Sequence, residues 1–455
     1  MRATAPAEKA GIPSVSIVAS AFVEQARIIS KYLGIGNLAV AEYPGHPQLD
    51  DQGTVRKKSE QVLLKNFLDA LATPAKEAVR PDEPGPTDIV FKGTLNEVQD
   101  FFHQSQWSDG LPVIPPTLER VHEFLKYTDR SPKEVLGVLP LEYREATIWS
   151  VAANGVMAGC RPEYMPILVA IVETINDKEF GFQHSGSTTG WEPLIILSGP
   201  IIKQLDFNYG SGVMRVGRQA NTSIGRFLRL YMRNIGGMRI PPGATDKGSI
   251  AQTFNVVLAE NEDAAAEIGW QPFSVDRGFK AGENVVSIQN SCNISGPTYT
   301  AGDKPEDHLE IIAEIIGRMM ERYIYYCAWT GRQNHLIVMS PGVAKAIAGA
   351  GWTKRDVKQY LYEHCKSPAK LAEKLARASG ITNFTLCEYV KKGLAPKEYC
   401  ESTDPDRLVP VFWSPESIGI VLSGDPGRNQ TKGYASNGRQ GAIVSKRIQL
   451  PAEVI

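Results

Sequence analysis

Residues 12–47 read "IPSVSIVASAFVEQARIISKYLGIGNLAVAEYPGHP" and contain the clearest alternation of strand and helix in the chain. Residues 12–20 are rich in Val and Ile, as in a buried strand, and residues 22–34 have helical spacing and end at a glycine. Residues 37–47 predict a second strand that runs into a turn, and residues 54–72 predict a second helix. Such a β-α-β-α unit pairs its strands in parallel.

Two parallel strands do not form a stable sheet alone, because parallel sheets are buried on both faces. The remaining strands must come from elsewhere in the chain or from another chain. We therefore expect a homo- or hetero-oligomer, or a sheet completed by the rest of the chain. Residues 74–92, "PAKEAVRPDEPGPTDIVFK", are rich in proline and charge and predict a linker after a first unit of residues 1–73.

Residues 93–455 alternate strands with helices, which predicts a larger layered α/β domain. The sequence Thr94 to Glu97, "TLNE", is a capping box that starts a helix to about Gln106, and Ser131 to Glu134, "SPKE", predicts a second helix start. The sequence shows no internal repeat. Strands are expected at residues 193–199, 253–261, 284–290, 336–341 and 418–424, and helices at 146–159, 162–177, 223–237, 304–323 and 353–365.

The composition excludes several classes of partner. The chain has 455 residues, 42% of them apolar and 22% charged, with a formal net charge of -1. This balance favours neither nucleic acid nor an acidic membrane surface. No apolar run approaches the ~18 residues of a membrane span. Residues 1–22 imitate a secretory signal, but Pro13 and two serines interrupt the apolar core, and its length suits a strand better.

The cysteines indicate a reducing compartment. None lies in a C-x-x-C pair or at zinc spacing with histidine, and we expect no disulfide framework in so large a chain. A cytoplasmic location follows from this interpretation. The six cysteines are Cys160, Cys292, Cys327, Cys365, Cys387 and Cys400.

Residues 11–47 resemble the second half of the UGSC-type domain, a family named for a selenocysteine (or cysteine)-Gly-Ser-Cys motif. The resembling features are "GIP" before a strand, a helix with an acid and alanine, and His-Pro after the next strand. The remainder resembles the larger protein associated with that family, through blocks such as "WSDGLPVIPPT", "VMAGCRPEYMP", "GRFLRLYMRNIGG", "AENED", "AGWTKRDVKQYLYE" and "SGDPGR".

The resemblance implies a thiol or selenol oxidoreductase. The selenocysteine/cysteine-Gly-Ser-Cys motif itself does not occur, and the chain starts where the second half of that domain would start. A redox function would therefore need a small partner subunit that bears the thiol or selenol and supplies the missing strands.

Cys160, in "GVMAGCRPEY", is the first candidate for the chemistry. Pro162 suits the first position of the following helix, so the thiol is expected near a positive helix end and beside Arg161. Both effects would lower the pKa of the thiol and favour the nucleophilic thiolate. The alternative is a small buried residue at a tight helix corner. Cys292, in "QNSCNISGP", is a second candidate.

The loop "FQHSGSTTGWEP" before the strand at 193–199 offers a second set of candidates. Its hydroxyl groups and imidazole could enclose an anionic or carbonyl ligand, with His184 as general acid or base. The alternative is an ordinary loop, and no Ser-His-Asp triad is predicted. The substrate-binding candidates in this loop are Ser185, Ser187, Thr188 and Thr189.

Arginines mark a third region. Arg215 and Arg218 lie in a glycine loop before a helix N-terminus, which is the pattern of an anion site. We expect both side chains to point into the main cleft and bind a carboxylate or phosphate. Arg226, Arg229 and Arg233 then recur on one helical face, which either extends this site or forms a solvated basic surface.

The stretch "WSDGLPVIPPT", Trp107 to Thr117, is stiffened by three prolines. It is either a rigid wall of the cleft, with Asp109 as an acid or orienting group, or a helix connection that buries Trp107, Leu111 and Val113.

Three further turns follow predicted strands. In "AENED", Asn261 or Glu262 either caps a helix, or the carboxylates bind a metal or act as acid and base. "SGDPGR" is a glycine turn at a strand's carboxyl end, where ligands bind in open sheets. His46, in "YPGHP", would face the cleft of the N-terminal unit and is a further substrate-binding candidate.

Three functions remain open. The first is an enzyme, or enzyme subunit, that acts on a small anionic metabolite by thiol-dependent redox or lyase chemistry through Cys160. The second is a metal- or acid/base-dependent hydrolase or lyase that uses His184, Asp109 and Glu260. The third is a non-catalytic subunit that completes a partner's active site. The sequence identifies no cofactor and leaves the question of a metal open.

Overall fold

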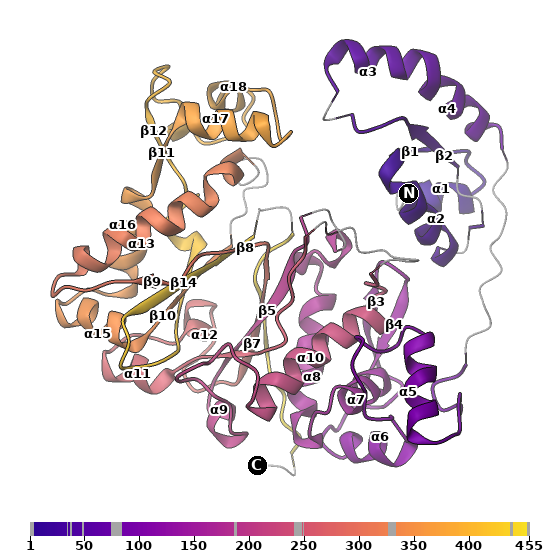
Figure 1. The fold of residues 1–455 in the computed structure, drawn as a ribbon, viewed down its shortest axis with the longest axis horizontal. Coiled ribbons are helices and arrows are strands. Elements are labelled where there is room, and N and C mark those ends of the chain that lie inside the picture. The colour runs from indigo at the N-terminus through magenta and orange to yellow at the C-terminus, as the bar shows by residue number, and fades with distance from the viewer. Residues whose placement is uncertain are drawn as a thin grey trace.

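The N-terminal unit is a β-α-β-α arrangement, as predicted. The computed structural model describes residues 4–33, 35–36, 39–47, 50–73, 84–185, 189–240, 248, 250–325, 334–436 and 440–452. Figure 1 draws the unit in indigo, apart from the large domain. Its elements are α1 (Thr4–Lys9), β1 (Ser16–Ala19), α2 (Val23–Tyr32), β2 (Val40–Tyr43), α3 (Gln52–Lys58) and α4 (Leu64–Leu71), with π-helical residues Ser59–Leu63 between the last two.

The sheet of this unit has two strands, β1 and β2, paired in parallel from Ser16 opposite Val40 to Ala19 opposite Tyr43. Ala41 and Tyr43 on β2 are buried, whereas Ile17 on β1 is 58% exposed. The described strands of the large domain add nothing to this sheet. The sequence left open whether the large domain or another chain completes this sheet. Among the described residues, the large domain does not.

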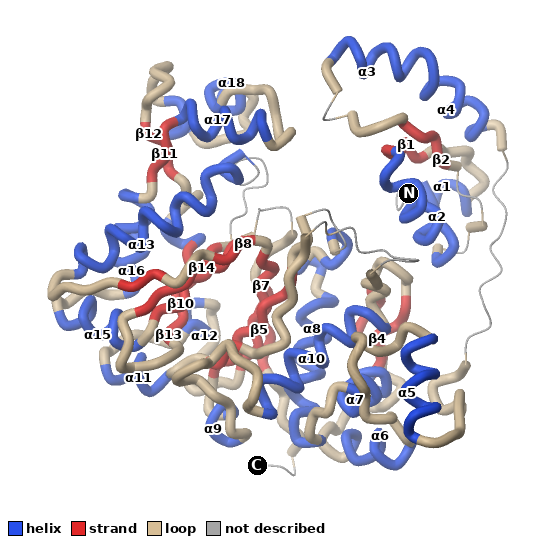
Figure 2. Tube along the Cα trace, viewed as in Figure 1, coloured by secondary structure: helices blue, strands red, loops and turns tan. Residues whose placement is uncertain are grey.

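The large domain is a layered α/β domain, as predicted (Figure 2). Its helices are α5 (Leu95–Gln104), α6 (Leu118–Leu125), α7 (Ile148–Met157), α8 (Met165–Asn176), α9 (Ile201–Gln204), α10 (Gln219–Asn234), α11 (Glu262–Glu267), α12 (Phe273–Asp276), α13 (Pro305–Met320), α15 (Pro341–Gly349), α16 (Lys354–His364), α17 (Ala369–Ala378) and α18 (Leu386–Lys391). Its strands are β3 (Val135–Leu139), β4 (Arg144–Thr147), β5 (Glu192–Ser198), β6 (Leu258–Ala259), β7 (Val285–Ser291), β8 (Asn293–Ile294), β9 (Thr298–Tyr299), β10 (His335–Met339), β11 (Lys366–Pro368), β12 (Leu408–Pro410), β13 (Ile418–Leu422), β14 (Gln430–Ala435) and β15 (Val444–Arg447).

The two main sheets share one topology, a structural repeat that no repeat in the sequence accompanies. One sheet has the order β6-β5-β7-β15 and the other β13-β10-β14-β8, with the short β9 also paired antiparallel to β14. In both, the first pair is parallel and the next two are antiparallel. The last strand of each sheet comes from the other half, because β8 follows β7 along the chain and β15 follows β14. Each central strand is also preceded along the chain by a long helix, α8 before β5 and α13 before β10; α8 is buried almost throughout, whereas α13 buries one face.

The apolar core forms three layers that follow this repeat. Leu194 and Ile196 on β5 pack with Leu336 and Val338 on β10 in one cluster between the two sheets. The alternate residues of β5 pack outward against α7, α8 and α10, and those of β10 pack against α13, α15 and α16. Alternation along a strand places successive side chains on opposite faces of its sheet, so each sheet is buried on both faces.

The prediction that a helix starts at "SPKE" is wrong, because the strand β3 follows this sequence. The residues after Glu134 read "VLGVLPLEYREAT", and they fold as the antiparallel hairpin β3–β4. Val135 and Val138 favour a strand, and Gly137 and Pro140 are unfavourable in a helix, so the local strand preference outweighs the capping signal. The capping box at Thr94 and Glu97 is confirmed at the start of α5.

Two further features bear on the earlier expectations. Among the described residues, no helix has the length and apolar character needed to cross a membrane. The predicted linker falls partly outside the described residues, and its described part, residues 84–92, contains neither helix nor strand.

Candidate functional site

The arginine face of α10 is neither a solvated surface nor an extension of an anion site. Arg226 forms a bidentate ion pair with Asp109, from Nε to Oδ2 at 2.9 Å and from Nη2 to Oδ1 at 2.8 Å. The two side chains are only 18% and 13% exposed. One turn further, Arg229 donates to Glu192 at the start of β5 (3.1 Å). Arg226 and Arg229 therefore neutralise largely buried carboxylates, which explains their spacing of one turn along the helix.

The stretch "WSDGLPVIPPT" is held against α10 by the same face. Arg226 donates to Pro112 O (2.9 Å), Arg233 donates to Gln106 O (2.8 Å), and Asn234 donates to Trp107 O (3.1 Å). These bonds satisfy backbone carbonyls that no strand or helix pairs. The stretch is thus the clamped connection between α5 and α6.

The side chains of this connection follow the burial expected of a helix connection only in part. Val113 is buried and Trp107 is half-buried, as expected, but Leu111 is 59% exposed. Burial acts to raise the pKa of Asp109, but the hydrogen bonds and charge of Arg226 outweigh it and hold this pKa below its usual value. Asp109 therefore remains a carboxylate that orients Arg226, and it is poorly suited to donate a proton.

Cys160 lies next to this ion pair but is not an activated thiol. It is buried, and burial raises its pKa to about 12, although a hydrogen bond with Ser223 and the charge of Arg226 act in the opposite direction. Arg161, which was expected to activate it, instead pairs with Glu163 (3.0 Å). The prediction that this pKa is lowered is therefore wrong, because the loss of water around the sulfur outweighs the nearby positive charges.

The loop before β5 is described only in part, because Ser187 and Thr188 lie outside the described residues, as does Cys327 elsewhere in the chain. His184 is exposed and its carbonyl accepts a hydrogen bond from Trp191 Nε1 (3.0 Å). Ser185 is buried, and Thr189 Oγ1 accepts from Gln440 Nε2 (3.3 Å). This loop therefore contacts the turn between β14 and β15, where the two halves of the repeat exchange strands.

Arg215 and Arg218 are both exposed on the loop before α10. Arg218 donates to Asp206 Oδ2 (2.7 Å), and these two side chains are 50% and 77% exposed. Neither arginine lines the cavity described next. The structure therefore leaves the predicted anion site at the surface. Gln219 Nε2, next to Arg218, donates to Gly159 O (3.5 Å), next to Cys160.

A cavity of about 360 Å³ lies at the carboxyl ends of the parallel strands β5 and β6. Its walls come from the segment after β5, from Tyr209, and from the turn after β6. The "SGDPGR" turn after β13 abuts the same place, since Gly424 N–H donates to Tyr209 O (3.1 Å). Ligands of open α/β sheets bind outside the carboxyl ends of strands. The lining residues are Gly199, Pro200, Ile202, Lys203, Gln204, Tyr209, Glu260, Glu262 and Asp263.

Glu260 is the buried carboxyl of this cavity. Its Oε2 accepts from Ser198 Oγ (2.7 Å), and both carboxyl oxygens lie within reach of Phe273 N–H, at 2.9 and 3.0 Å. Burial raises the pKa of Glu260 to about 7, although Lys354, Ser198 and the Phe273 amide act to lower it. The charge of Glu262 raises it further. Glu260 can therefore change its protonation state near neutral pH.

Glu262 is half-buried and starts α11. Its Oε1 accepts from Gly199 N–H (2.7 Å), and burial raises its pKa above the usual value. Asn261 caps α11 through Ala264 N–H (3.0 Å), so the capping alternative for "AENED" is confirmed for Asn261. Glu260 and Glu262 remain available as a carboxyl pair. In the part of the chain that the structure describes, no group of three or more His, Cys, Asp or Glu side chains could hold a metal.

The remaining candidates lie elsewhere. His46 is in the N-terminal unit, where its ring packs edge-on against Phe22. Cys292 is half-exposed, and its backbone N–H donates to Ala435 O (2.9 Å) where β7 passes into β8. Neither residue lines the cavity beyond β5 and β6.

Comparison with known protein families gives a match for the N-terminal β-α-β-α unit. Residues 1–73 match the UGSC family. The resemblance seen in the sequence of this unit is therefore confirmed, whereas the resemblance of the large domain has no such match. No curated protein and no solved structure matches the chain.

The carboxyls of the cavity are among the acid–base candidates that the sequence offered in "AENED". "AENED" directly follows an apolar run, and the carboxyl ends of parallel strands share one edge of a sheet. What the sequence did not reveal is that Ser198, Phe273 and Lys354, far apart along the chain, surround Glu260.

Proposed function

We propose that the chain is an enzyme, or the subunit of an enzyme, that performs acid–base chemistry on a small polar metabolite in the cavity beyond β5 and β6. The observation that carries the proposal is the position of Glu260 and Glu262 in the wall of a cavity at the carboxyl ends of parallel strands. Adjacent carboxyls whose environments raise their pKa values are typical of general acids and bases.

The two carboxyls have different roles in this proposal. Glu262 is half-buried, so it can reach a bound molecule and donate or accept a proton. Glu260 is almost fully buried and takes part as the second carboxyl of the pair: its own pKa is raised by burial and further by the charge of Glu262. Three acids and one lysine line the cavity, and the lysine, Lys203, is paired with Asp263 (2.6 Å). This balance favours a neutral or cationic substrate over the anionic metabolite expected from the sequence.

Thiol-dependent chemistry at Cys160 is the weaker alternative, because the buried thiol has a raised pKa. Redox or lyase chemistry that depends on a thiol would need a sulfur from elsewhere. The match of residues 1–73 to the UGSC family supports a search for such a partner but assigns no reaction to this chain.

A screen of small polar metabolites tests the proposal, with substrate loss followed by mass spectrometry. We expect Glu262→Gln to lower the rate at least on the order of a hundredfold, the usual worth of a general acid or base. Glu267→Gln is the matched control, because Glu267 is exposed on the same helix and pairs with Lys345 (2.6 Å). Equal rates in the wild type and a folded Glu262→Gln protein would refute the assignment.

A second candidate function is that of a subunit whose N-terminal unit completes the fold of a partner. The exposure of Ile17 on β1 and of Leu64 and Leu68 on α4 favours it. It is compatible with catalysis in the large domain, and it predicts assembly through residues 4–73.

A further inference from the structure

A small module projects from the second half of the repeat between α16 and β13 (Figure 1). The chain enters it through β11 and leaves through β12, which pair antiparallel, and α17 and α18 lie between them. Cys387 on α18 and Cys400 are joined there by a disulfide bond across a sequence separation of 13 residues. From the size of the chain and the cysteine spacing we expected no disulfide framework, and this bond is a correction to that expectation.

These two cysteines differ from the buried ones in accessibility. Cys387 and Cys400 are both half-exposed, whereas Cys160 and Cys365 are buried. An external thiol can therefore reach the sulfur atoms of Cys387 and Cys400 while the protein stays folded. Exposed disulfides are the ones that take part in thiol exchange, whereas buried ones resist reduction.

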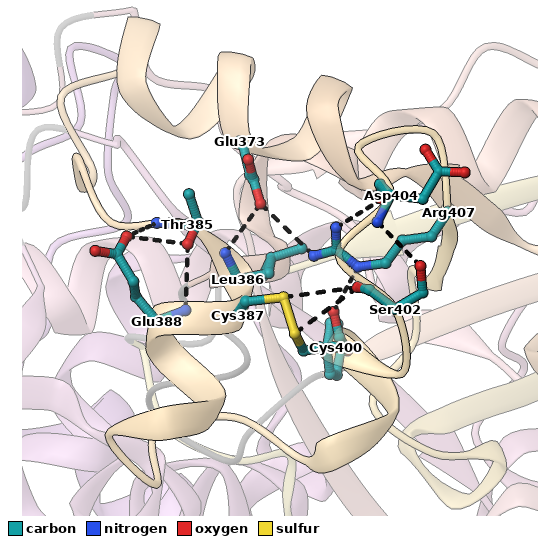
Figure 3. The surroundings of a disulfide bond; sticks show 10 residues. Glu373, Thr385, Leu386, Cys387, Glu388, Cys400, Ser402, Asp404 and Arg407 are labelled. Carbon is teal, nitrogen blue, oxygen red and sulfur yellow. Dashed lines mark hydrogen bonds and ion pairs between the residues drawn. A yellow bond between two sulfur atoms is a disulfide. The ribbon is translucent and has the colours of Figure 1, made fainter.

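The backbone beside each cysteine is held by bonds that do not involve sulfur (Figure 3). Leu386 N–H, next to Cys387, donates to Glu373 Oε1 (3.1 Å). Arg407 Nε donates to Tyr399 O, next to Cys400 (3.2 Å). Arg407 and Glu373 form an ion pair at 3.7 Å, so a single charge pair on neighbouring elements fixes both cysteines. The two sulfurs would therefore stay near each other after reduction.

An acceptor for the reduced thiols is already in place. The carbonyl oxygen of Ser402 lies 3.8 Å from the Sγ of Cys387 and 3.8 Å from the Sγ of Cys400. A thiol is a weak hydrogen-bond donor, and this carbonyl is within reach of both. Reduction thus leaves neither sulfur without a polar partner, and the folded module accommodates both redox forms.

We propose that Cys387 and Cys400 form a reversible dithiol–disulfide site at which the folded protein exchanges two electrons and two protons with an external dithiol. A thiolate of the external dithiol attacks one sulfur of the disulfide, which breaks the S–S bond and releases the other cysteine as a thiol. The second thiol of the external molecule, as thiolate, then attacks its own sulfur in the mixed disulfide, which closes the external disulfide and releases the remaining cysteine as a thiol. The protein gains two thiols and the external dithiol leaves as a cyclic disulfide; the reverse reaction oxidises the protein.

Titration with dithiothreitol tests the site. The native protein is equilibrated at a series of ratios of reduced to oxidised dithiothreitol, alkylated with iodoacetamide, and mapped by mass spectrometry. We expect Cys387 and Cys400 to become alkylated together and to re-form the disulfide when the ratio is reversed. Circular dichroism should stay native throughout, and Cys160 and Cys365 should stay unlabelled.

Variants test the role of the charge pair. Without the charge pair the two thiols have a lower effective concentration, so the disulfide is easier to reduce. Arg407→Ala should therefore lower, by roughly tenfold, the ratio of reduced to oxidised dithiothreitol at which half of the protein is reduced. Arg377→Ala, an exposed arginine on α17, should leave the ratio unchanged. Should Arg407→Ala fail to fold, Glu373→Gln tests the same pair from its other side.

Two results would overturn the inference. Reduction that occurs only together with loss of native circular dichroism would make the bond a structural staple. Thiols that remain reduced at every ratio would show that the pair does not form a disulfide under exchange conditions. Neither result bears on acid–base chemistry at Glu262, which has its own variant and readout.

Discussion

At the scale of single residues, Glu260 couples proton binding to folding. Its pKa rises from 4.5 in the unfolded chain to about 7 in the folded one. The folded state therefore binds the proton more tightly, and the stability from this group is fully present below pH 4.5 and lost as the pH rises through 7. We expect the difference to be on the order of 3 kcal/mol.

Urea unfolding at pH 5 and pH 8 measures this contribution. Glu260→Gln carries no titrating group at this position, so its free energy of unfolding should fall less between the two pH values than that of the wild type. Glu267→Gln should behave as the wild type. An identical pH dependence in Glu260→Gln and the wild type would contradict the raised pKa.

Asp109 gives a second prediction at this scale. Removal of one partner of a buried ion pair costs roughly 3–5 kcal/mol, because the other charge stays buried and unpaired. We expect Asp109→Asn to lose about 2–4 kcal/mol of unfolding free energy, since the pair is partly exposed and Asn retains one acceptor. The midpoint of chemical denaturation measures this loss.

The matched control is Asp206→Asn, which removes a pair of the same chemistry with Arg218 at the surface. Exposed pairs contribute about 0–1 kcal/mol. Equal losses in the two variants would mean that the clamp on "WSDGLPVIPPT" adds nothing beyond a surface contact.

At the scale of elements, long apolar runs were predictable and short polar strands were not. The helices α7 and α8 and the strands β5, β7, β10 and β13 follow runs that are buried on all or most sides, and α10 and α13 follow amphipathic patterns with one buried face. β14 and β15, by contrast, read "QTKGYA" and "VSKR", and their strand conformation comes from pairing with β10 and β7. Pairing of this kind depends on contacts far apart in sequence, which local patterns do not carry.

The crossing from β14 to β15 provides the prediction at this scale. Gly441 has a φ of +83°, and a Cβ there would collide with the carbonyl oxygens of Phe180 and Glu179. The neighbouring Ala442 N–H donates to Glu179 O (2.8 Å), so the backbone cannot withdraw without losing a hydrogen bond. Gly441→Ala should therefore lose more than about 2 kcal/mol of unfolding free energy.

Gly393→Ala separates the collision from the backbone conformation. Its φ is +68°, and a Cβ there would meet nothing within 4 Å. This variant should lose only about 1 kcal/mol, from the left-handed conformation alone. Similar midpoints of urea denaturation for the two variants would show that the crossing tolerates a side chain.

At the scale of the whole molecule, the repeat was hidden because its two halves share topology more than residues. "LIILSG" and "LIVMSP" occupy equivalent central strands, but the helices and turns around them differ in length. The cavity could not be predicted either, because Glu260 acquires its environment only when β5, β6 and α12 come together in the folded chain. Ordinary residue patterns indicated the acids and the strand ends, and the tertiary fold supplied the burial that shifts their pKa values.

The N-terminal unit gives the last prediction, which concerns assembly. Its parallel sheet has two strands, and Ile17 on β1, with Leu64 and Leu68 one turn apart on α4, are each at least 55% exposed. Burial of a leucine side chain contributes roughly 1.5–3 kcal/mol, so these residues favour association. We expect the full chain to be an oligomer by analytical ultracentrifugation, and residues 84–455 alone to be a smaller assembly. Leu64→Glu with Leu68→Glu should dissociate the full chain in the same way, whereas Leu408→Glu, at an exposed leucine of the large domain, should not. A full chain that sediments as a monomer at micromolar concentration would contradict self-association, and the unit would then need a different protein to cover it.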